Sequence, residues 1–251
     1  MAARADTAEL SRFGLPASVH ACLFDLDGVL TRTATVHRTA WKQTFDKVLA
    51  GHGEPPFTDA DYARYVDGKP RRDGVRDFLA SRGIHPPEGD PGDPPDADTV
   101  AGIGNRKNEL LLQRLDSDGV EVFEGSVAYL RAVRAAGFRT AVVTASANGE
   151  AVVRAGGFAD LVEVRIDGIV ADRDGLAGKP APDTFLAGAR ALDVEPTKAA
   201  VFEDALAGVA AGRDGGFGWV VGVDRADQAD ALRTYGADVV VHDLSELLEV
   251  P

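Results

Sequence analysis

Cysteine is almost missing from this chain, because Cys22 is the single one among 251 residues. One thiol excludes an internal disulfide and a cysteine-rich zinc site, and it fits a reducing compartment. Long apolar runs are missing as well, since no stretch approaches the ~18 residues that a membrane span needs. The first twenty residues carry Arg4, Asp6, Glu9 and Arg12 where a secretion signal needs an apolar block. We therefore expect a cytoplasmic protein that has no membrane partner.

Positive charge is scarce too. The chain has 27 lysines and arginines against 40 aspartates and glutamates, which gives a net charge of −13. This balance argues against nucleic acid as the main partner, and an anionic ligand needs a locally basic pocket. The hydrophobic content of 45% is ordinary for a globular protein, and 251 residues suit one large domain or two unequal ones. We expect the chain to be a monomer.

Six short apolar runs of strand type recur along the chain, at residues 21–24, 140–143, 162–166, 199–202, 219–223 and 239–241. Alanine-rich segments with a helical pattern lie between the later runs, at 126–136, 182–192 and 205–213. Strands that alternate with helices indicate an α/β fold with a doubly wound parallel sheet.

The pattern changes between Thr33 and about Leu115, where strand-type runs give way to amphipathic helical stretches at 34–49, 59–66, 74–82 and 99–115. We expect a small helical domain, residues 34–115, inserted into a core formed by 1–33 and 116–251. Residues 86–98 are rich in proline, glycine and acid and predict a mobile surface loop. Residues 1–19 are interpreted as an N-terminal extension without an assigned function.

Polar residues follow the predicted strands, where open α/β sheets bind their ligands. Asp25 and Asp27 come directly after the first strand, and Gly28 allows a sharp turn. Two carboxylates one residue apart tend to project to the same side, so one could attack phosphorus while the other transfers protons. The alternative is a capped, solvated turn.

Glu203 and Asp204 follow a later strand and, together with Asp25, would supply the hard oxygen ligands that Mg²⁺ prefers. The alternative is an ordinary helix cap. Thr144, Ser146 and Asn148 follow another strand and precede a helix, where an anion binds well. Helix capping is the alternative there too. Lys179 adds a positive charge, unless it is only a solvated loop lysine.

With these residues in view, the sequence resembles the haloacid dehalogenase superfamily of phosphotransferases, and within it the β-phosphoglucomutase family. The superfamily's signatures account for FDLDGVL at 24–30, VTAS at 143–146, GKP at 178–180 and FED at 202–204, in the family's order. The resemblance covers the chain from about His20 onward. It implies a modified Rossmann core with an α-helical cap domain inserted just after the first strand.

By that resemblance, Asp25 is the nucleophile that becomes a phosphoaspartate, and Asp27 is the general acid and base. Thr144 and Lys179 would hold the phosphate that is transferred. The implied Mg²⁺ ligands are the Asp25 carboxylate, the Asp27 backbone carbonyl and Asp204, with Glu203 bound to the ion or directly beside it.

The resemblance also implies a set of residues that holds the sugar and its second phosphate. On the first cap helix, Thr33, His37 and Trp41 recur at a spacing of four and share one helical face. Each member of the set has a plainer alternative as part of a buried stripe or as a solvated charge. The full implied set is Thr33, His37, Trp41, Gly68, Arg71, Lys107, Ser146 and Asn148.

Two positions depart from the family's pattern. Arg32 stands where the family usually has aspartate, and Ala205 replaces the serine that commonly follows Glu-Asp. Neither change removes a catalytic group, and Arg32 puts the identity of the sugar in doubt more than the type of reaction.

We therefore expect a Mg²⁺-dependent mutase whose substrate is a small phosphorylated sugar. The expected reaction converts β-glucose 1-phosphate to glucose 6-phosphate through the 1,6-bisphosphate. A phosphatase acting on a sugar phosphate or another small phosphate ester is the main alternative. A non-catalytic binding module of the same fold is another, because fold alone does not establish activity. Dehalogenation fits less well, since it leaves Asp27 and the acidic metal site without a purpose.

Overall fold

The computed structural model describes residues 13–248. Contacts divide the chain into two compact units, Met1–Thr31 with Val122–Pro251 and, between them, Arg32–Glu121. We call them the core unit and the cap unit. The cap unit extends a few residues beyond the insert expected at 34–115. Among the described helices, none has the length and apolar character to span a bilayer.

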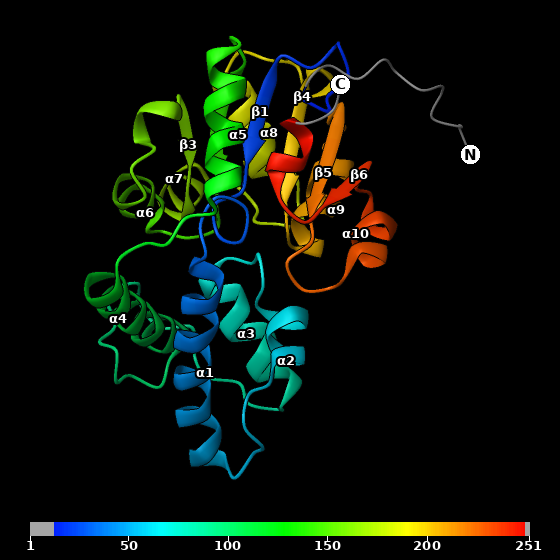
Figure 1. The fold of residues 1–251 in the computed structure, drawn as a ribbon. Coiled ribbons are helices and arrows are strands. Elements are labelled where there is room, and N and C mark those ends of the chain that lie inside the picture. Colours follow the sequence, from blue (N-terminus) through cyan, green and yellow to red (C-terminus); the bar gives the residue numbers. More distant parts are fainter. Residues whose placement is uncertain (1–12, 249–251) are drawn as a thin grey trace. The chain divides into compact units, whose positions relative to one another are not determined.

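A six-stranded parallel sheet in the order β3-β2-β1-β4-β5-β6 forms the core unit (Figure 1). The strands are β1 Ala21–Phe24, β2 Arg139–Val143, β3 Val164–Ile166, β4 Ala199–Glu203, β5 Trp219–Val223 and β6 Val239–Val241. All residues of β1 and β4 are buried, as expected for central strands covered on both faces. The predicted α/β fold with a parallel sheet is confirmed, and the strands lie close to their expected ranges.

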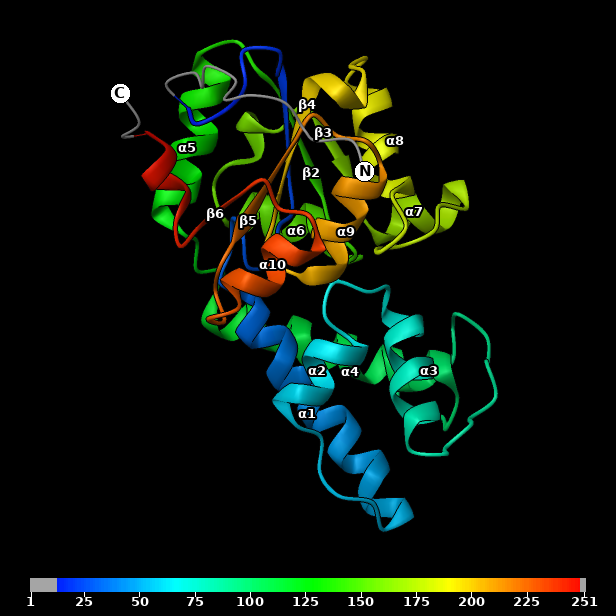
Figure 2. The same ribbon diagram turned by 90° about the vertical axis from the view of Figure 1, so that its right-hand side faces the viewer.

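Helices cover both faces of this sheet, with α5 on one side and α8 and α9 on the other (Figure 2). The close approach of α8 depends on Gly188, because a Cβ there would lie 3.0 Å from the Leu23 side chain of β1. The helices of the core unit are α5 Glu124–Ala135, α6 Gly149–Ala155, α7 Gly168–Asp174, α8 Asp183–Ala191, α9 Leu206–Asp214 and α10 Ala229–Tyr235, with 3-10 turns η1 Ala159–Leu161, η2 Pro196–Lys198 and η3 Leu244–Leu248.

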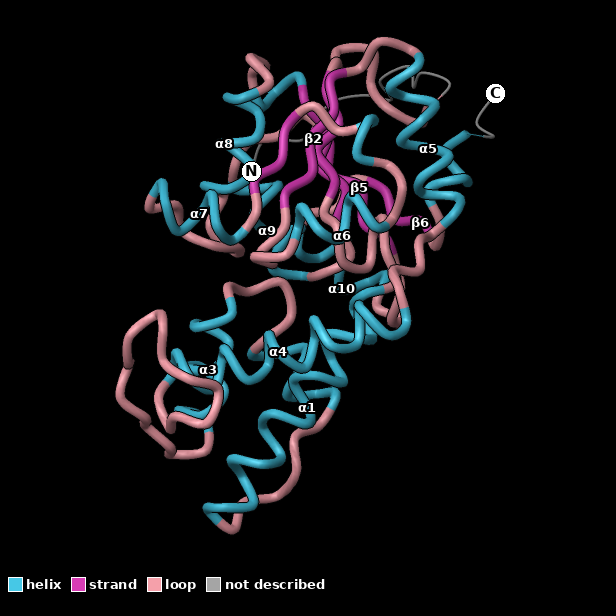
Figure 3. Tube along the Cα trace, turned by 90° about the vertical axis from the view of Figure 1, so that its left-hand side faces the viewer, coloured by secondary structure: helices cyan, strands magenta, loops and turns pink. Residues whose placement is uncertain are grey.

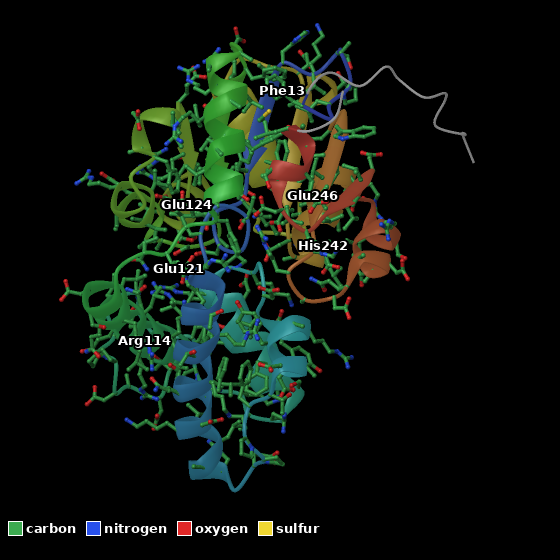
Figure 4. All side chains as sticks on the ribbon, in the orientation of Figure 1. Phe13, Arg114, Glu121, Glu124, His242 and Glu246 are labelled. Carbon is green, nitrogen blue, oxygen red and sulfur yellow. The ribbon has the colours of Figure 1, made fainter. Side chains whose placement is uncertain are left out.

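The chain joins the hydrophobic core well before β1. Phe13, Leu15 and Val19 are buried, and the ring of Phe13 lies edge-on to Phe138 at 5.6 Å between centroids. The Tyr129 hydroxyl of α5 donates a hydrogen bond of 2.8 Å to the carbonyl of Phe13, a residue labelled in Figure 4. The part of the expected extension from residue 13 onward therefore belongs to the core, while residues 1–12 lie outside the described residues.

Only helices and loops are seen in the cap unit (Figure 3). The helices are α1 Thr33–His52, α2 Asp59–Tyr65, α3 Arg71–Ser81 and α4 Val100–Asp118. Phe45 lies at the centre of their core, 4.9 Å from the Trp41 ring and 4.4 Å from the Phe78 ring. Thr58 and Asp61 form a capping box that fixes the start of α2.

The loop between α3 and α4 contains the segment expected to be mobile, residues 86–98. It has no helix or strand, as expected, but the neighbouring helices bind it at several points. Arg76 of α3 forms a bidentate pair with Glu88, at 2.9 Å for both contacts. On α4, Asn105 donates to the Asp93 carbonyl and Arg106 donates to the Pro95 carbonyl. These contacts explain how a segment without an apolar face lies against the cap.

We predict that Phe45→Ala lowers the free energy of unfolding of the cap unit by about 3–5 kcal/mol, because the ring leaves a cavity that the packed core cannot close. Of the two tryptophans, Trp41 lies in the cap unit and Trp219 in the core unit. In a Trp219→Phe background, Trp41 fluorescence during urea unfolding therefore reports on the cap alone. Leu112→Ala, at a position 42% exposed, is the control. Equal losses in the two variants would contradict the prediction.

Candidate active site

The candidate site is built on the central strands of the core unit. Phe24 of β1 pairs with Val142 of β2 and with Phe202 of β4, so these three strands end at one edge of the sheet. Asp25 follows β1, and its N–H extends the pairing to the Phe202 carbonyl at 2.9 Å. Thr144 follows β2. Parallel pairing thus brings together residues that are far apart in the sequence.

Lys179 lies between α7 and α8, and its buried ammonium group joins three strand ends. It donates to an Asp25 carboxylate oxygen at 2.5 Å, to a Glu203 oxygen at 2.6 Å and to the Val143 carbonyl at 3.1 Å. The lysine side chain is only 2% exposed. The interpretation of Lys179 as a solvated loop residue is therefore wrong.

Burial and charge decide the protonation of this cluster. Burial raises the pKa of Asp25, and the nearby Glu203 and Asp27 carboxylates raise it further against the opposing effect of Lys179. For Lys179, burial alone would lower the pKa, but the two carboxylates hold its pKa above the usual value. The lysine therefore keeps its charge, yet one ammonium does not balance all the carboxylates around it.

The donor chemistry of this cluster fits a hard divalent cation. Carboxylate oxygens of Asp25, Glu203 and Asp204 lie within 4.8 Å of one another. Such oxygens are what Mg²⁺ prefers, and a divalent ion would neutralise the excess negative charge. One Glu203 oxygen accepts from Lys179 and the other from the Ala205 N–H, at 2.6 and 2.8 Å. Glu203 is therefore engaged with protein donors on both oxygens.

The second carboxylate of the first motif, Asp27, faces the loop that follows β2. The Thr144 hydroxyl donates to an Asp27 carboxylate oxygen at 3.2 Å and accepts from the Ser146 N–H at 3.1 Å. The Ser146 hydroxyl accepts in turn from the Asn148 N–H at 3.2 Å, one residue before α6 begins. The structure thus brings Asp27, Thr144, Ser146 and Asn148 together around one turn.

Gly28 is required by the geometry of the same turn. Its φ of +101° lies in a region that favours glycine. A Cβ at this position would also overlap the Asp204 carboxylate. The turn after Asp27 and the end of β4 are therefore in direct contact, and a side chain on residue 28 would separate them.

Three of the predicted substrate residues cluster within the cap unit. Lys107 of α4 is buried, and its Nζ lies 3.0 Å from His37 Nδ1 and 5.2 Å from the Trp41 ring centroid. Since an ammonium group only donates, the His37 Nδ1 accepts. Thr33 is the first residue of α1 and is buried. The sequence interpretation of Lys107 as a solvated charge is wrong.

The remaining cap residues lie at the start of α3. Gly68 has a φ of +70° in the preceding loop. Arg71 is the first residue of the helix rather than part of that loop. A Cβ at Gly104 of α4 would lie 3.3 Å from Arg71 Cγ, so the arginine stem runs against α4.

The two residues that depart from the family's pattern, Arg32 and Ala205, both contact nearby acidic residues. The Arg32 side chain pairs with Glu121 at 2.9 Å, and its backbone N–H donates to the Glu121 carbonyl at 2.8 Å. Arg32 therefore ties together the two ends of the cap unit. Ala205 is buried, and its N–H binds Glu203. A hydroxyl is not needed for that contact.

Two residues that the sequence did not indicate also contact the site. Arg225 and Gln228, in the loop after β5, bind the backbone at Gly28 and Asp204, at 2.9 and 3.0 Å. The one feature of the sequence that could have indicated these two residues is their position after a predicted strand. Neither is an acid or a recognised motif residue, so strand-end chemistry alone did not single them out.

A family model for haloacid dehalogenase-like hydrolases matches residues 19–216. The chain belongs to this family, and it is an enzyme of the phosphotransferase type. It is 56% identical over 245 residues to the β-phosphoglucomutase of Mycobacterium tuberculosis, with 94% of each chain covered. It is also 30% identical over 233 residues to validoxylamine A 7'-phosphate phosphatase of Streptomyces hygroscopicus, covering 90% of this chain and 94% of that protein.

Among solved structures, a β-phosphoglucomutase from Clostridium difficile superimposes with a TM-score of 0.73 at 23% identity. The match covers 91% of this chain and 93% of that one. At this identity the likeness concerns the fold. The resemblance to the superfamily and to β-phosphoglucomutases that the sequence indicated is confirmed.

We predict that Lys179→Met lowers the free energy of unfolding by about 3–5 kcal/mol, because it leaves two carboxylates buried without their cation. The measurement is urea unfolding with a chelator present. Arg154→Met removes an exposed pair with Glu150 and should cost no more than about 1 kcal/mol. Adding Glu203→Gln to Lys179→Met should restore part of the loss. A small effect of Lys179→Met, equal to that of the control, would contradict the prediction.

Proposed function

We propose that this enzyme is a Mg²⁺-dependent mutase that interconverts β-glucose 1-phosphate and glucose 6-phosphate. The observation that carries the proposal is the cluster that His37 forms with the buried Trp41 and Lys107 in the cap unit, while the core unit carries the phosphotransfer residues. Hydrolysis of a single phosphate ester does not require residues for a second phosphate. The 56% identity to a β-phosphoglucomutase supports the same reaction.

The proposed reaction passes a phosphoryl group through Asp25. In the phosphorylated enzyme, a sugar hydroxyl gives its proton to Asp27 and attacks phosphorus, so the bond to Asp25 breaks and the 1,6-bisphosphate forms. After the bisphosphate turns, Asp25 attacks its other phosphate. The bond to the sugar oxygen then breaks, and Asp27 returns the proton to that oxygen. Phosphoaspartate is regenerated and the product leaves.

The core residues have distinct roles in this proposal. Lys179 and Thr144 bind oxygens of the phosphate that is transferred, and the 3.2 Å contact between Thr144 and Asp27 supports their acting on the same group. Mg²⁺, when bound, neutralises charge on the phosphate and the carboxylates. Asp25, Asp204 and the Asp27 carbonyl would hold it. Because both Glu203 oxygens are engaged with protein donors, we assign Glu203 to orienting Lys179, beside the ion.

The cap residues would select the sugar and its second phosphate. Arg71 offers a planar guanidinium suited to bidentate phosphate binding. Lys107, held by His37, would contact the substrate. Ser146 and Asn148 would add further phosphate contacts from the core. Thr33, Trp41 and Gly68 complete the proposed set.

A sugar-phosphate phosphatase remains the second candidate. The specific observation in its favour is the 30% identity to a phosphatase over nearly the full length of that protein. The two candidates share the first half-reaction and differ in the acceptor, which is a sugar hydroxyl in the mutase and water in the phosphatase.

We predict that ³¹P NMR separates these two candidates. With Mg²⁺, β-glucose 1-phosphate and a trace of the 1,6-bisphosphate, glucose 6-phosphate should accumulate with little inorganic phosphate. The Arg71→Ala variant should lose most of this conversion, because it removes the guanidinium proposed to bind the second phosphate. Inorganic phosphate as the main product of the wild type would refute the mutase and support the phosphatase.

We predict that Asp27→Asn lowers turnover by about 10²–10⁴-fold, the usual contribution of a positioned acid and base, or roughly 3–5 kcal/mol. Calorimetry should show Mg²⁺ binding retained, because the proposed ligand at this residue is its backbone carbonyl. Asp230→Asn, at a fully exposed carboxylate on α10, is the control and should keep normal turnover. Near-normal turnover of Asp27→Asn in a steady-state assay would remove Asp27 from the mechanism.

A further inference from the structure

The loop that follows β5, residues 224–228, contacts the turn after β1 and the residue after β4, both of which belong to the candidate metal site. Arg225 Nε donates to the Gly28 carbonyl at 2.9 Å, directly after Asp27. Gln228 Nε2 donates to the Asp204 carbonyl at 3.0 Å. One short loop therefore binds the backbone on two different strand ends.

The Arg225 side chain is itself fixed by further contacts in the core unit. Its guanidinium carbon lies 3.5 Å from the centroid of the Phe123 ring. Its NH1 donates to the carbonyl of His242, a residue labelled in Figure 4, at 2.5 Å. A guanidinium held by a ring face and a second acceptor has few orientations available, so its bond to Gly28 has a defined direction.

Asp224 binds the backbone of this loop. Asp224 is buried, and one carboxylate oxygen accepts from the N–H groups of Ala226 and Gln228, at 3.2 and 2.9 Å. The Asp224 N–H donates to the Val241 carbonyl of β6 at 2.8 Å. These bonds place the two donor side chains relative to the sheet.

The turn at Gly28 is held by hydrogen bonds on both sides of the residue. Its N–H donates to the Thr31 carbonyl at 2.8 Å and its carbonyl accepts from Arg225, so both adjoining peptides are held. The Asp204 carboxylate occupies the space beside its Cα. A shift of the turn would therefore move the Asp27 carbonyl and the Asp204 carboxylate relative to each other.

We propose that Arg225 and Gln228 are positioning residues that fix the distance between the Asp27–Gly28 turn and Asp204. They touch neither the substrate nor the reacting atoms in this proposal. They act through the backbone of Gly28, which directly follows Asp27, and through the backbone of Asp204. The inference rests on the proposed function for the roles of Asp27 and Asp204, but the contacts themselves do not depend on it.

The test compares Arg225→Met with Arg233→Met, which alters an exposed arginine of α10 paired with Asp230. Partners that orient metal ligands typically contribute about 10–100-fold to metal affinity or activity. We expect Arg225→Met to weaken Mg²⁺ binding by about tenfold or more in calorimetry and to lower kcat to a similar degree. The KM for the sugar phosphate should change less than about twofold, because the proposed sugar-binding residues are untouched.

Two further variants sharpen the test. Arg225→Lys keeps a donor for the Gly28 carbonyl but not the planar group, so it should recover part of the Mg²⁺ affinity. Gln228→Met should weaken Mg²⁺ binding in the same direction. Unchanged Mg²⁺ affinity in Arg225→Met would overturn the proposal, even if the variant unfolds more easily. If the wild type releases only inorganic phosphate, the mutase assignment fails, while the calorimetric comparison still decides the role of Arg225.

Discussion

The buried ammonium group of Lys179 is the contact on which the core site depends. It binds Asp25, Glu203 and the end of β2 at once. Burying an ionised carboxylate without a partner costs several kcal/mol, and two adjacent ionised carboxylates also repel each other. Because the sheet places β1 beside β4, their terminal carboxylates cannot avoid this proximity. A cation between them is therefore a condition for the sheet edge to exist in this form.

One lysine does not complete the charge balance. Asp204 adds a further carboxylate to this cluster. Burial, together with the Glu203 and Asp27 carboxylates, raises the pKa of Asp25 despite the opposing effect of Lys179. A phosphate dianion approaching this cluster alone would be repelled. In the proposed mechanism, a divalent cation would remove that difficulty. Gly28 leaves room for the Asp204 carboxylate beside the turn, because a Cβ at residue 28 would overlap it.

The sequence predicted the fold well because the fold depends on local patterns. Apolar runs followed by Asp25, Thr144 and Glu203 give the strands and the chemistry at their ends. The pairing of Lys107 with His37 could not be derived, since it depends on how α1 and α4 pack. Arg225 could not be singled out, because the backbone carbonyl that it binds, that of Gly28, is far away in the sequence. Phe13 falls in the expected extension because its partner on α5, Tyr129, lies more than a hundred residues further along the chain.

The choice between transfer and hydrolysis follows from the acceptor rather than from the core. Asp25, Asp27 and Lys179 can serve either reaction, because phosphoryl transfer relies on position and charge neutralisation. A sugar hydroxyl held beside a phosphoaspartate can reach an effective concentration of about 10⁵–10⁸ M, far above that of water. A cap that binds the sugar firmly therefore favours transfer even without complete exclusion of water. In the proposed reaction, the contacts of Lys107 with His37 and Trp41 would therefore influence the outcome more than any residue of the sheet.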